Sequence, residues 1–170
     1  HLSLRRQRQM CIRDRIITYV REGAITHEDS LGNRGRTEAG DVQVMSAGTG
    51  ITHSEYNRED EETRIFQIWI IPDRAGEKPS WGAQPFPKDD RAGSFVTLAS
   101  GRAGDDGALP IRADARVVGA TIKAGETLRY RLDAGRHAYL VPATGRIEVN
   151  GAAAKARDGV AISDLDEIAI

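Results

Sequence analysis

Glycine and aspartate turns divide this chain into short runs of β-branched and aromatic residues, and this division most constrains its fold. In the second half such runs are bounded by turn residues at 95–99, 116–123, 127–132, 137–142, 146–150 and 159–163. Asn150-Gly151 is a favoured hairpin turn, because both residue types accept the positive φ that tight hairpins require. Long helical periods are few, so we expect an all-β protein of short strands joined by tight turns.

The first half follows the same rule. We expect strands over residues 16–20 and 24–28, and a turn cluster at 29–33 that completes a β-meander. Residues 65–72 form the most apolar run of the chain, which favours a buried strand that ends at Pro72.

A proline-rich segment follows that strand. Residues 73–90 hold three prolines and two glycines, so we expect no regular element there and interpret the segment as an inter-domain connection. Trp81 and Phe86 are the side chains expected to anchor it. At 170 residues and 39% hydrophobic content, the chain can bury a core as one large domain or two small ones.

Residues 40–57 read GDVQVMSAGTGITHSEYN and contain the strongest functional signal. If residues 51–56 are extended, His53 and Glu55 lie on one face, with Asn57 continuing that face. An imidazole beside a carboxylate forms half of a metal site or an acid–base pair, and the combination suits non-haem iron and similar divalent metals. The alternative is a solvated edge strand. The glycines that precede His53 favour a site, because they permit backbone paths closed to other residues.

This stretch resembles the second cupin motif of the pirin family, Gly-Asp-Val-Gln-x-Met-Ser-Ala-Gly-x-Gly-x-x-His-Ser-Glu-x-Asn. Residues 68–72, Ile-Trp-Ile-Ile-Pro, resemble the family's link from its first barrel to its second. The resemblance implies a bicupin with two jelly-roll-like β-barrels. We expect a partial N-terminal domain over 16–71, an inter-domain segment over 72–92, and a C-terminal cupin-like domain over 93–170 that lacks a last strand.

The resemblance also implies a chemistry. The family holds one iron-type metal in the N-terminal barrel, so Fe(II) or another divalent transition metal is the expected cofactor. Some members cleave quercetin as 2,3-dioxygenases, which implies a flavonol-like aromatic substrate. The ligands carried over to this chain are His53 and Glu55. A carboxylate can also take a phenolic proton, so Glu55 is expected as a metal ligand, as the catalytic base, or as both in turn.

Residues 1–15 match no part of this pattern. Family members carry two metal-ligating histidines just before the equivalent of Ile16, and an ungapped count puts those positions at Gln9 and Cys11. We assign no ligand role to either residue, and we expect residues 1–15 to be a non-native or disordered segment that leaves the N-terminal barrel incomplete. A basic arm for nucleic acid is the alternative.

Two further histidines, His27 and His137, are candidate ligands. His27 lies on a predicted return strand, and the family pattern has no ligand there, so we expect a hydrogen-bonded structural or surface residue. His137 has no carboxylate two residues on, and we expect it to be structural as well.

Charge and composition argue against three classes of protein: those that bind nucleic acid directly, those with internal disulfides and those that span a membrane. Residues 1–15 carry five arginines and one aspartate, or +4, so with a total of −1 the remainder carries −5, which argues against direct nucleic-acid binding. A single cysteine excludes an internal disulfide and fits a reducing cytoplasm. No apolar run reaches about eighteen residues, so we expect no membrane span. We expect a cytoplasmic monomer.

Three functions remain open at this level. The first is a metal-dependent oxygenase. Turnover of a flavonol that requires added metal would identify it. The second is a non-enzymatic metal-binding regulator that acts through a protein partner. Metal-dependent binding of the partner without turnover would identify it. The third is an inactive fragment that lacks half of its metal site.

Overall fold

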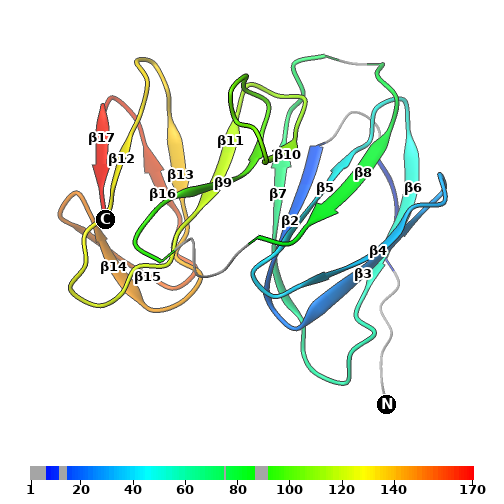
Figure 1. The fold of residues 1–170 in the computed structure, drawn as a ribbon, viewed down its shortest axis with the longest axis horizontal. Coiled ribbons are helices and arrows are strands. Elements are labelled where there is room, and N and C mark those ends of the chain that lie inside the picture. Colours follow the sequence, from blue (N-terminus) through cyan, green and yellow to red (C-terminus); the bar gives the residue numbers. More distant parts are fainter. Residues whose placement is uncertain (1–6, 12–14, 75, 87–91) are drawn as a thin grey trace. The chain divides into compact units, whose positions relative to one another are not determined.

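The computed structural model describes residues 7–11, 15–74, 76–86 and 92–170, and every regular element in these ranges is a β-strand (Figure 1). The all-β expectation is therefore confirmed. The first strands are β1 (Gln7–Cys11), β2 (Arg15–Glu22), β3 (Ala24–Asp29), β4 (Arg34–Glu38), β5 (Val42–Ser46), β6 (Ile51–Tyr56), β7 (Arg64–Ile70) and β8 (Ser80–Gln84). The later strands are β9 (Val96–Ser100), β10 (Leu109–Pro110), β11 (Arg116–Gly119), β12 (Arg129–Arg131), β13 (Ala138–Leu140), β14 (Arg146–Val149), β15 (Ala152–Lys155), β16 (Val160–Ile162) and β17 (Glu167–Ala169).

Two four-stranded antiparallel sheets form the N-terminal barrel, in the orders β1-β6-β3-β4 and β7-β2-β5-β8. Their inner faces share one core, in which Ile51 of β6 packs with Ile16 of β2 and Met45 of β5. The central strands β2 and β5 are buried on both faces, which explains their unbroken β-branched runs.

The expectation of a buried strand over residues 65–72 is wrong in one respect. β7 is an edge strand, with β2 as its one neighbouring strand among the described residues, and Trp69 and Ile71 remain 47% and 89% exposed. The run is apolar because its other residues pack onto β2, with which it pairs from Arg15↔Ile70 to Val20↔Ile65.

The expectation of no regular element in residues 73–90 is also wrong. β8 lies in that segment and pairs with β5, from Val42↔Gln84 to Ser46↔Ser80. The strand fits between the prolines, since Pro79 precedes it and Pro85 follows it. Phe86 is buried and Trp81 packs on the core, so the two expected anchors are confirmed.

The second half forms pairs of short strands, and most lie where turn spacing predicted them. β12 pairs with β17, β13 with β16, and β14 with β15. The Asn150-Gly151 hairpin is confirmed, because φ is 47° at Asn150 and 86° at Gly151 and Val149 faces Ala152 across the turn. β10 and β15 were not predicted, since neither has the β-branched composition of a typical strand.

The chain divides into two compact units at positions that differ from the expected boundaries. One unit holds residues 1–88 and 97–119, and the other holds 89–96 and 120–170. Strands β9 to β11 therefore pack with the N-terminal sheets, where the carbonyl of Gly107 accepts a hydrogen bond from Gln84 at 2.9 Å. The expected end of the N-terminal domain at residue 71 and the expected start of the C-terminal domain at residue 93 stay predictions.

Residues within 1–15 also take part in the sheets. β1 pairs with β6 over five residues, with Gln9 opposite His53 and Cys11 opposite Ile51. Arg15 begins β2, is fully buried, and forms an ion pair with Glu77 at 3.5 Å. Residues 1–6 and 12–14 lie outside the described part, so the origin of the segment stays a prediction.

Within the described ranges, no helix is long and apolar enough to cross a membrane.

Candidate functional site

His53 and Glu55 lie on the inner face of β6, as the period of two predicts. His53 is 4% exposed, and the Glu55 side chain retains 12% exposure. Tyr56 and Ser54 alternate with them along the strand. Asn57 does not continue the site: it follows β6, and its side chain bonds the carbonyl of Glu61 and the amide of Glu59.

The carboxylate of Glu55 is held by one row of the facing sheet. Thr18, Gln43 and Gln67 lie opposite one another across β2, β5 and β7. The Thr18 hydroxyl donates to Oε1 at 3.5 Å, the Gln67 amide donates to Oε2 at 3.2 Å, and the Gln43 amide also donates to Oε1. Three neutral donors on one carboxylate fix its orientation.

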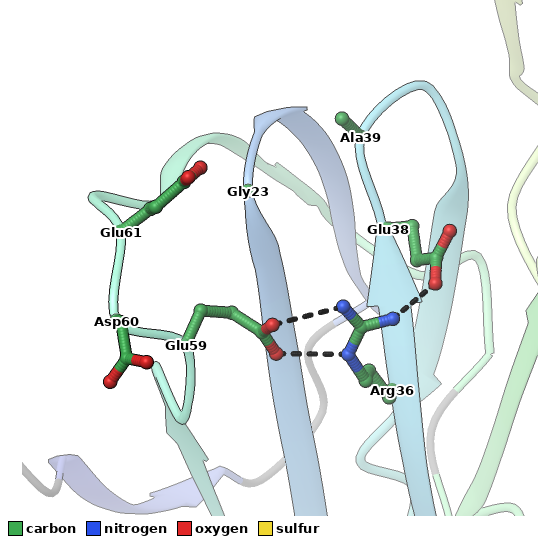
Figure 2. Close-up of a pocket in the computed structure, with 7 residues that line it drawn as sticks. All are labelled: Gly23, Arg36, Glu38, Ala39, Glu59, Asp60 and Glu61. Atoms are coloured by element: carbon green, nitrogen blue, oxygen red, sulfur yellow. Dashed lines mark hydrogen bonds and ion pairs between the residues drawn. The ribbon is translucent and has the colours of Figure 1, made fainter.

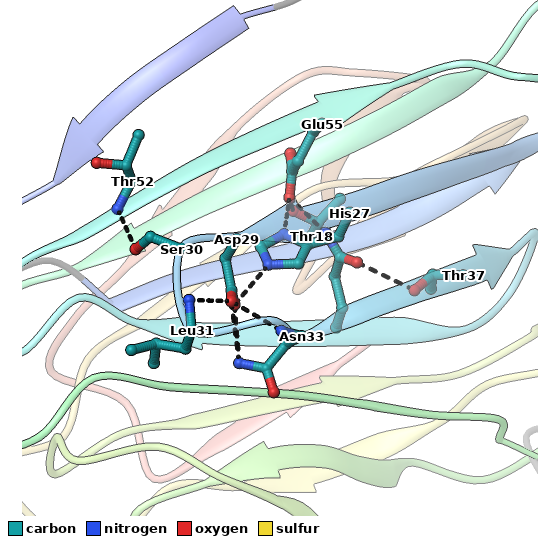
Figure 3. A network of polar contacts seen from close by, with 10 residues as sticks. Thr18, His27, Asp29, Ser30, Leu31, Asn33, Thr37, Thr52 and Glu55 are labelled. Atoms are coloured by element: carbon teal, nitrogen blue, oxygen red, sulfur yellow. Dashed lines mark hydrogen bonds and ion pairs between the residues drawn. The ribbon is translucent and has the colours of Figure 1, made fainter.

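His27 is the neighbour of Glu55 that sequence reasoning did not assign to the site. It lies opposite Glu55 in the β3–β6 register and is fully buried. Its Nε2 lies 3.1 Å from Oδ2 of Asp29, and its Nδ1 lies 3.8 Å from Oε1 of Glu55 (Figure 3). The expected hydrogen bond of His27 is confirmed, whereas its exclusion from the ligand set stays a prediction.

Asp29 fixes the tautomer of His27. Burial alone would raise the pKa of this carboxyl, but hydrogen bonds from Asn33, His27 and the Leu31 amide outweigh it and leave the pKa lowered. A carboxylate only accepts hydrogen bonds, so Nε2 of His27 carries a proton and donates it to Asp29. The spacing His27-x-Asp29 on a strand is the signal that could have found this pair.

His53 is a neutral imidazole in an aromatic stack. Burial lowers its pKa, and the nearby Glu55 carboxylate raises it by less. Its ring stacks on His27 with centroids 5.6 Å apart, and His27 stacks on Trp81 at 4.9 Å. Nδ1 of His53 is buried and has no hydrogen-bond partner among the described residues. Neutral imidazole is the form of histidine that ligates metals.

Comparison with known proteins shows the family to which this chain is related. The Pirin family model matches residues 11–70, and the model of the quercetinase C-terminal cupin domain matches residues 97–170. The chain is 33% identical to a bacterial pirin, YhhW from Escherichia coli, solved in complex with nickel(II); the TM-score is 0.86, and 96% of this chain covers 69% of that one. This chain belongs to the pirin family.

Curated pirin relatives carry the name of an enzyme. A Pseudomonas aeruginosa protein with the provisional name quercetin 2,3-dioxygenase is 72% identical over 88% of this chain and 64% of its own length. Quercetin 2,3-dioxygenase of Escherichia coli is 36% identical over 91% of this chain and 66% of its own length. The chain thus spans about two thirds of the length of these relatives. The two cupin-type domains of the expected bicupin are confirmed.

The donor set of this pirin fits a divalent metal in part. His53 supplies a buried nitrogen and Glu55 a carboxylate, while the described residues contain no group of three or more histidine, cysteine, aspartate or glutamate side chains placed to hold an ion. In the register of β1 with β6, position 9 pairs with His53 and position 11 pairs with Ile51.

Two other features lie apart from the site. His137 is exposed just before β13, in the second unit. A hollow near the turn after β2 is lined by Gly23, Arg36, Glu38, Ala39, Glu59, Asp60 and Glu61 (Figure 2). Arg36 bridges Glu38 and Glu59 there, so the carboxylates are already paired with a cation. The hollow is a solvated surface feature.

Proposed function

We propose that this chain supplies the metal-binding and catalytic half-site of a quercetin 2,3-dioxygenase-type pirin. His53 and Glu55 are two ligands of a divalent metal, for which we propose Fe(II), and Glu55 is also the base. The observation that carries the proposal is the pairing of two groups: a buried imidazole nitrogen of His53 that has no hydrogen-bond partner in the described part of the chain, and an oriented carboxylate at Glu55. The nickel(II) held by the related YhhW supports a divalent metal in this fold.

The electrostatics around Glu55 favour a cation. Oε1 of Glu55 lies 3.8 Å from Nδ1 of His27, which is buried and has no hydrogen-bond partner among the described residues. The carboxylate would attract a cation placed between these two groups and His53. The buried imidazoles and the single carboxylate match the ligand types of non-haem iron sites.

Each residue of the site has its own role in the proposed reaction. A bound metal would act as a Lewis acid that orients the oxygens of a flavonol. Glu55 accepts the phenolic proton, which makes the ring electron-rich and reactive toward oxygen. Thr18, Gln43 and Gln67 hold the carboxylate in one orientation during the transfer. The aromatic stack of His53 on His27 keeps the ligand ring from rotating.

Metal titration of paired variants tests the ligand assignment. The double variant Gln9→His/Cys11→His places two imidazoles opposite the β6 residues His53 and Ile51. We expect it to bind Fe(II) or Ni(II) more tightly than the parent chain, and by more than the ~10–100-fold that outer-shell partners contribute. Calorimetry measures the two affinities side by side.

The matched control moves the histidines by one residue. Arg8→His/Met10→His pairs with Ser54 and Thr52 and therefore occupies the opposite face of β1. We expect no gain in affinity from it, and we expect Glu55→Gln to remove the gain in the first variant while circular dichroism stays unchanged. Equal, tight binding by the parent chain would contradict the assignment and point to His27.

Turnover separates the enzyme from the regulator. The Gln9→His/Cys11→His variant loaded with metal should consume oxygen with quercetin, and Glu55→Gln should lose this activity. Tight metal binding with no oxygen uptake for any flavonol would contradict the enzyme.

A further inference from the structure

We propose that Trp69 is a specificity-determining residue that contacts a planar aromatic substrate beside the site and, through Gln67, positions Glu55. The inference rests on the proposed function and deepens it. It starts from the exposed aromatic residue on β7, which the fold alone does not explain.

Trp69 lies on the inward face of its sheet. It is two residues from Gln67, whose side chain reaches inward to Glu55, so both side chains leave β7 on the same face. In register Trp69 lies opposite Ile16, a residue of the inner core that is 2% exposed. Trp69 nevertheless keeps 47% of its surface accessible. A large aromatic side chain is therefore directed toward the site and left partly uncovered.

Hydrogen bonds join this indole to the carboxylate. Nε1 of Trp69 donates to Oε1 of Gln67 at 3.2 Å, and Nε2 of Gln67 donates to Oε2 of Glu55 at 3.2 Å. An indole nitrogen only donates and a carboxylate only accepts, so the amide of Gln67 has one orientation that satisfies both. Moving the indole therefore moves the amide that orients Glu55.

The second tryptophan shows what a covered indole looks like here. Trp81 occupies the same cross-strand row, because Trp81 faces Met45, Met45 faces Ile16, and Ile16 faces Trp69. Trp81 is stacked on the His27 ring with an interplanar angle of 10°. The row thus ends in one indole packed on the buried stack and one indole open at the edge strand.

A flat aromatic ligand suits the open indole. Aromatic rings prefer offset-stacked or edge-to-face contact, and an indole supplies a large rigid surface. Ile71, which directly follows β7, is also apolar and 89% exposed. A flavonol seated on this surface would lie beside Gln67 and Glu55, so stacking and proton transfer would act on one molecule.

Intrinsic fluorescence tests the contact without requiring turnover. The chain has two tryptophans, so Trp81→Phe leaves Trp69 as the reporter and Trp69→Phe leaves Trp81. With quercetin as the probe, we expect saturable quenching of Trp69 emission in the first protein and little quenching in the second. Calorimetry should show at least a tenfold weaker quercetin affinity for Trp69→Ala, and unchanged affinity for Tyr139→Ala, an exposed aromatic of the other unit.

Kinetics test the positioning role in the metal-loaded Gln9→His/Cys11→His protein. Gln67→Leu keeps the indole and breaks the link, so kcat should fall while KM stays constant. Trp69→Phe keeps a stacking ring without the donor and should also lower kcat with little change in KM. Trp69→Ala should raise KM and lower kcat. Equal kinetics for Gln67→Leu and its parent would overturn the positioning role.

The outcomes separate this inference from the proposed function. Quercetin binding that depends on Trp69, without oxygen uptake, supports the contact and rejects the enzyme. Quercetin affinity unchanged by Trp69→Ala overturns the contact, whatever the turnover. Self-association of the parent chain that Trp69→Ala abolishes, with no effect on quercetin, would assign the surface to a second copy of the chain and also overturn the proposal.

Discussion

At the scale of single residues, the site depends on contacts that leave no space for a methyl group. Gly35 in β4 lies against the ring of Trp81, where an added Cβ would come within 2.1 Å of Cη2. The same ring stacks on His27, which contacts both His53 and Glu55. The absence of a side chain at residue 35 is thus connected to the site through two stacked rings.

We expect Gly35→Ala to lower the free energy of unfolding by about 1–3 kcal/mol, because overpacking forces a neighbour off its preferred position. The matched control is Gly82→Ala in β8, where the added Cβ meets only Leu109, at 3.6 Å. Neither glycine has a φ in the left-handed region. Gly82→Ala should be neutral or stabilise by up to ~1 kcal/mol. Urea unfolding measures both, and equal losses would contradict the steric argument.

At the scale of elements, the carboxylate of Asp105 links strands β9 and β11 through hydrogen bonds. Asp105, between β9 and β10, accepts two hydrogen bonds from Arg116 of β11, at 2.5 and 2.6 Å. It also accepts one from the Ser100 hydroxyl at the end of β9. The Arg116 guanidinium, with help from Ser100, lowers the pKa of Asp105 below its ordinary value of 3.8.

This lowered pKa predicts a pH dependence of stability. A carboxyl whose pKa is lower in the folded than in the unfolded protein stabilises the fold above the unfolded pKa. The contribution is lost as pH falls from about 4 through the lowered folded pKa. We therefore expect Asp105→Asn to be less stable than its parent at pH 6, with the gap closing toward pH 3. Urea unfolding between pH 3 and pH 6 measures it.

The control for this prediction is Asp106→Asn, the same change one residue along. Its unfolding free energy should follow the parent curve in shape across this pH range. A constant difference between Asp105→Asn and its parent at every pH would contradict the assignment, because the loss would then come from packing and not from ionisation.

At the scale of the whole molecule, strands β9 to β11 belong to the first compact unit. The quercetinase C-terminal domain model nevertheless begins at residue 97. Leu98, Leu109 and Ile111 are buried, and Arg112 donates to the carbonyl of Lys78 at 2.9 Å. The family boundary along the sequence and the boundary of packed structure therefore differ.

Two fragments of the chain discriminate between these boundaries. We expect a fragment of residues 1–119 to fold and a fragment of residues 1–92 to remain unfolded. Burial of Leu98, Leu109 and Ile111 contributes about 1.5–3 kcal/mol each, and the sum is comparable to the ~5–15 kcal/mol that stabilises a typical domain. Thermal unfolding followed by circular dichroism measures this, and equal cooperative transitions in both fragments would contradict it.

Much of this protein follows from local sequence patterns. The period of two put His53 and Glu55 on one face, and the Asn150-Gly151 turn predicted its hairpin, because both depend on residues adjacent in the chain. The motif over residues 40–57 was sufficient to indicate the pirin family, since its glycines and its His-Ser-Glu segment lie within one continuous stretch.

Other features depended on the tertiary structure. His27 contacts Glu55 because β3 and β6 pair in one register, and Gln43 and Gln67 converge on that carboxylate because β5 and β7 flank β2. Such registers join residues far apart in the chain and are set by packing, which a local pattern does not encode. For the same reason an apolar run became the edge strand that leaves Trp69 exposed, and a proline-rich segment became β8.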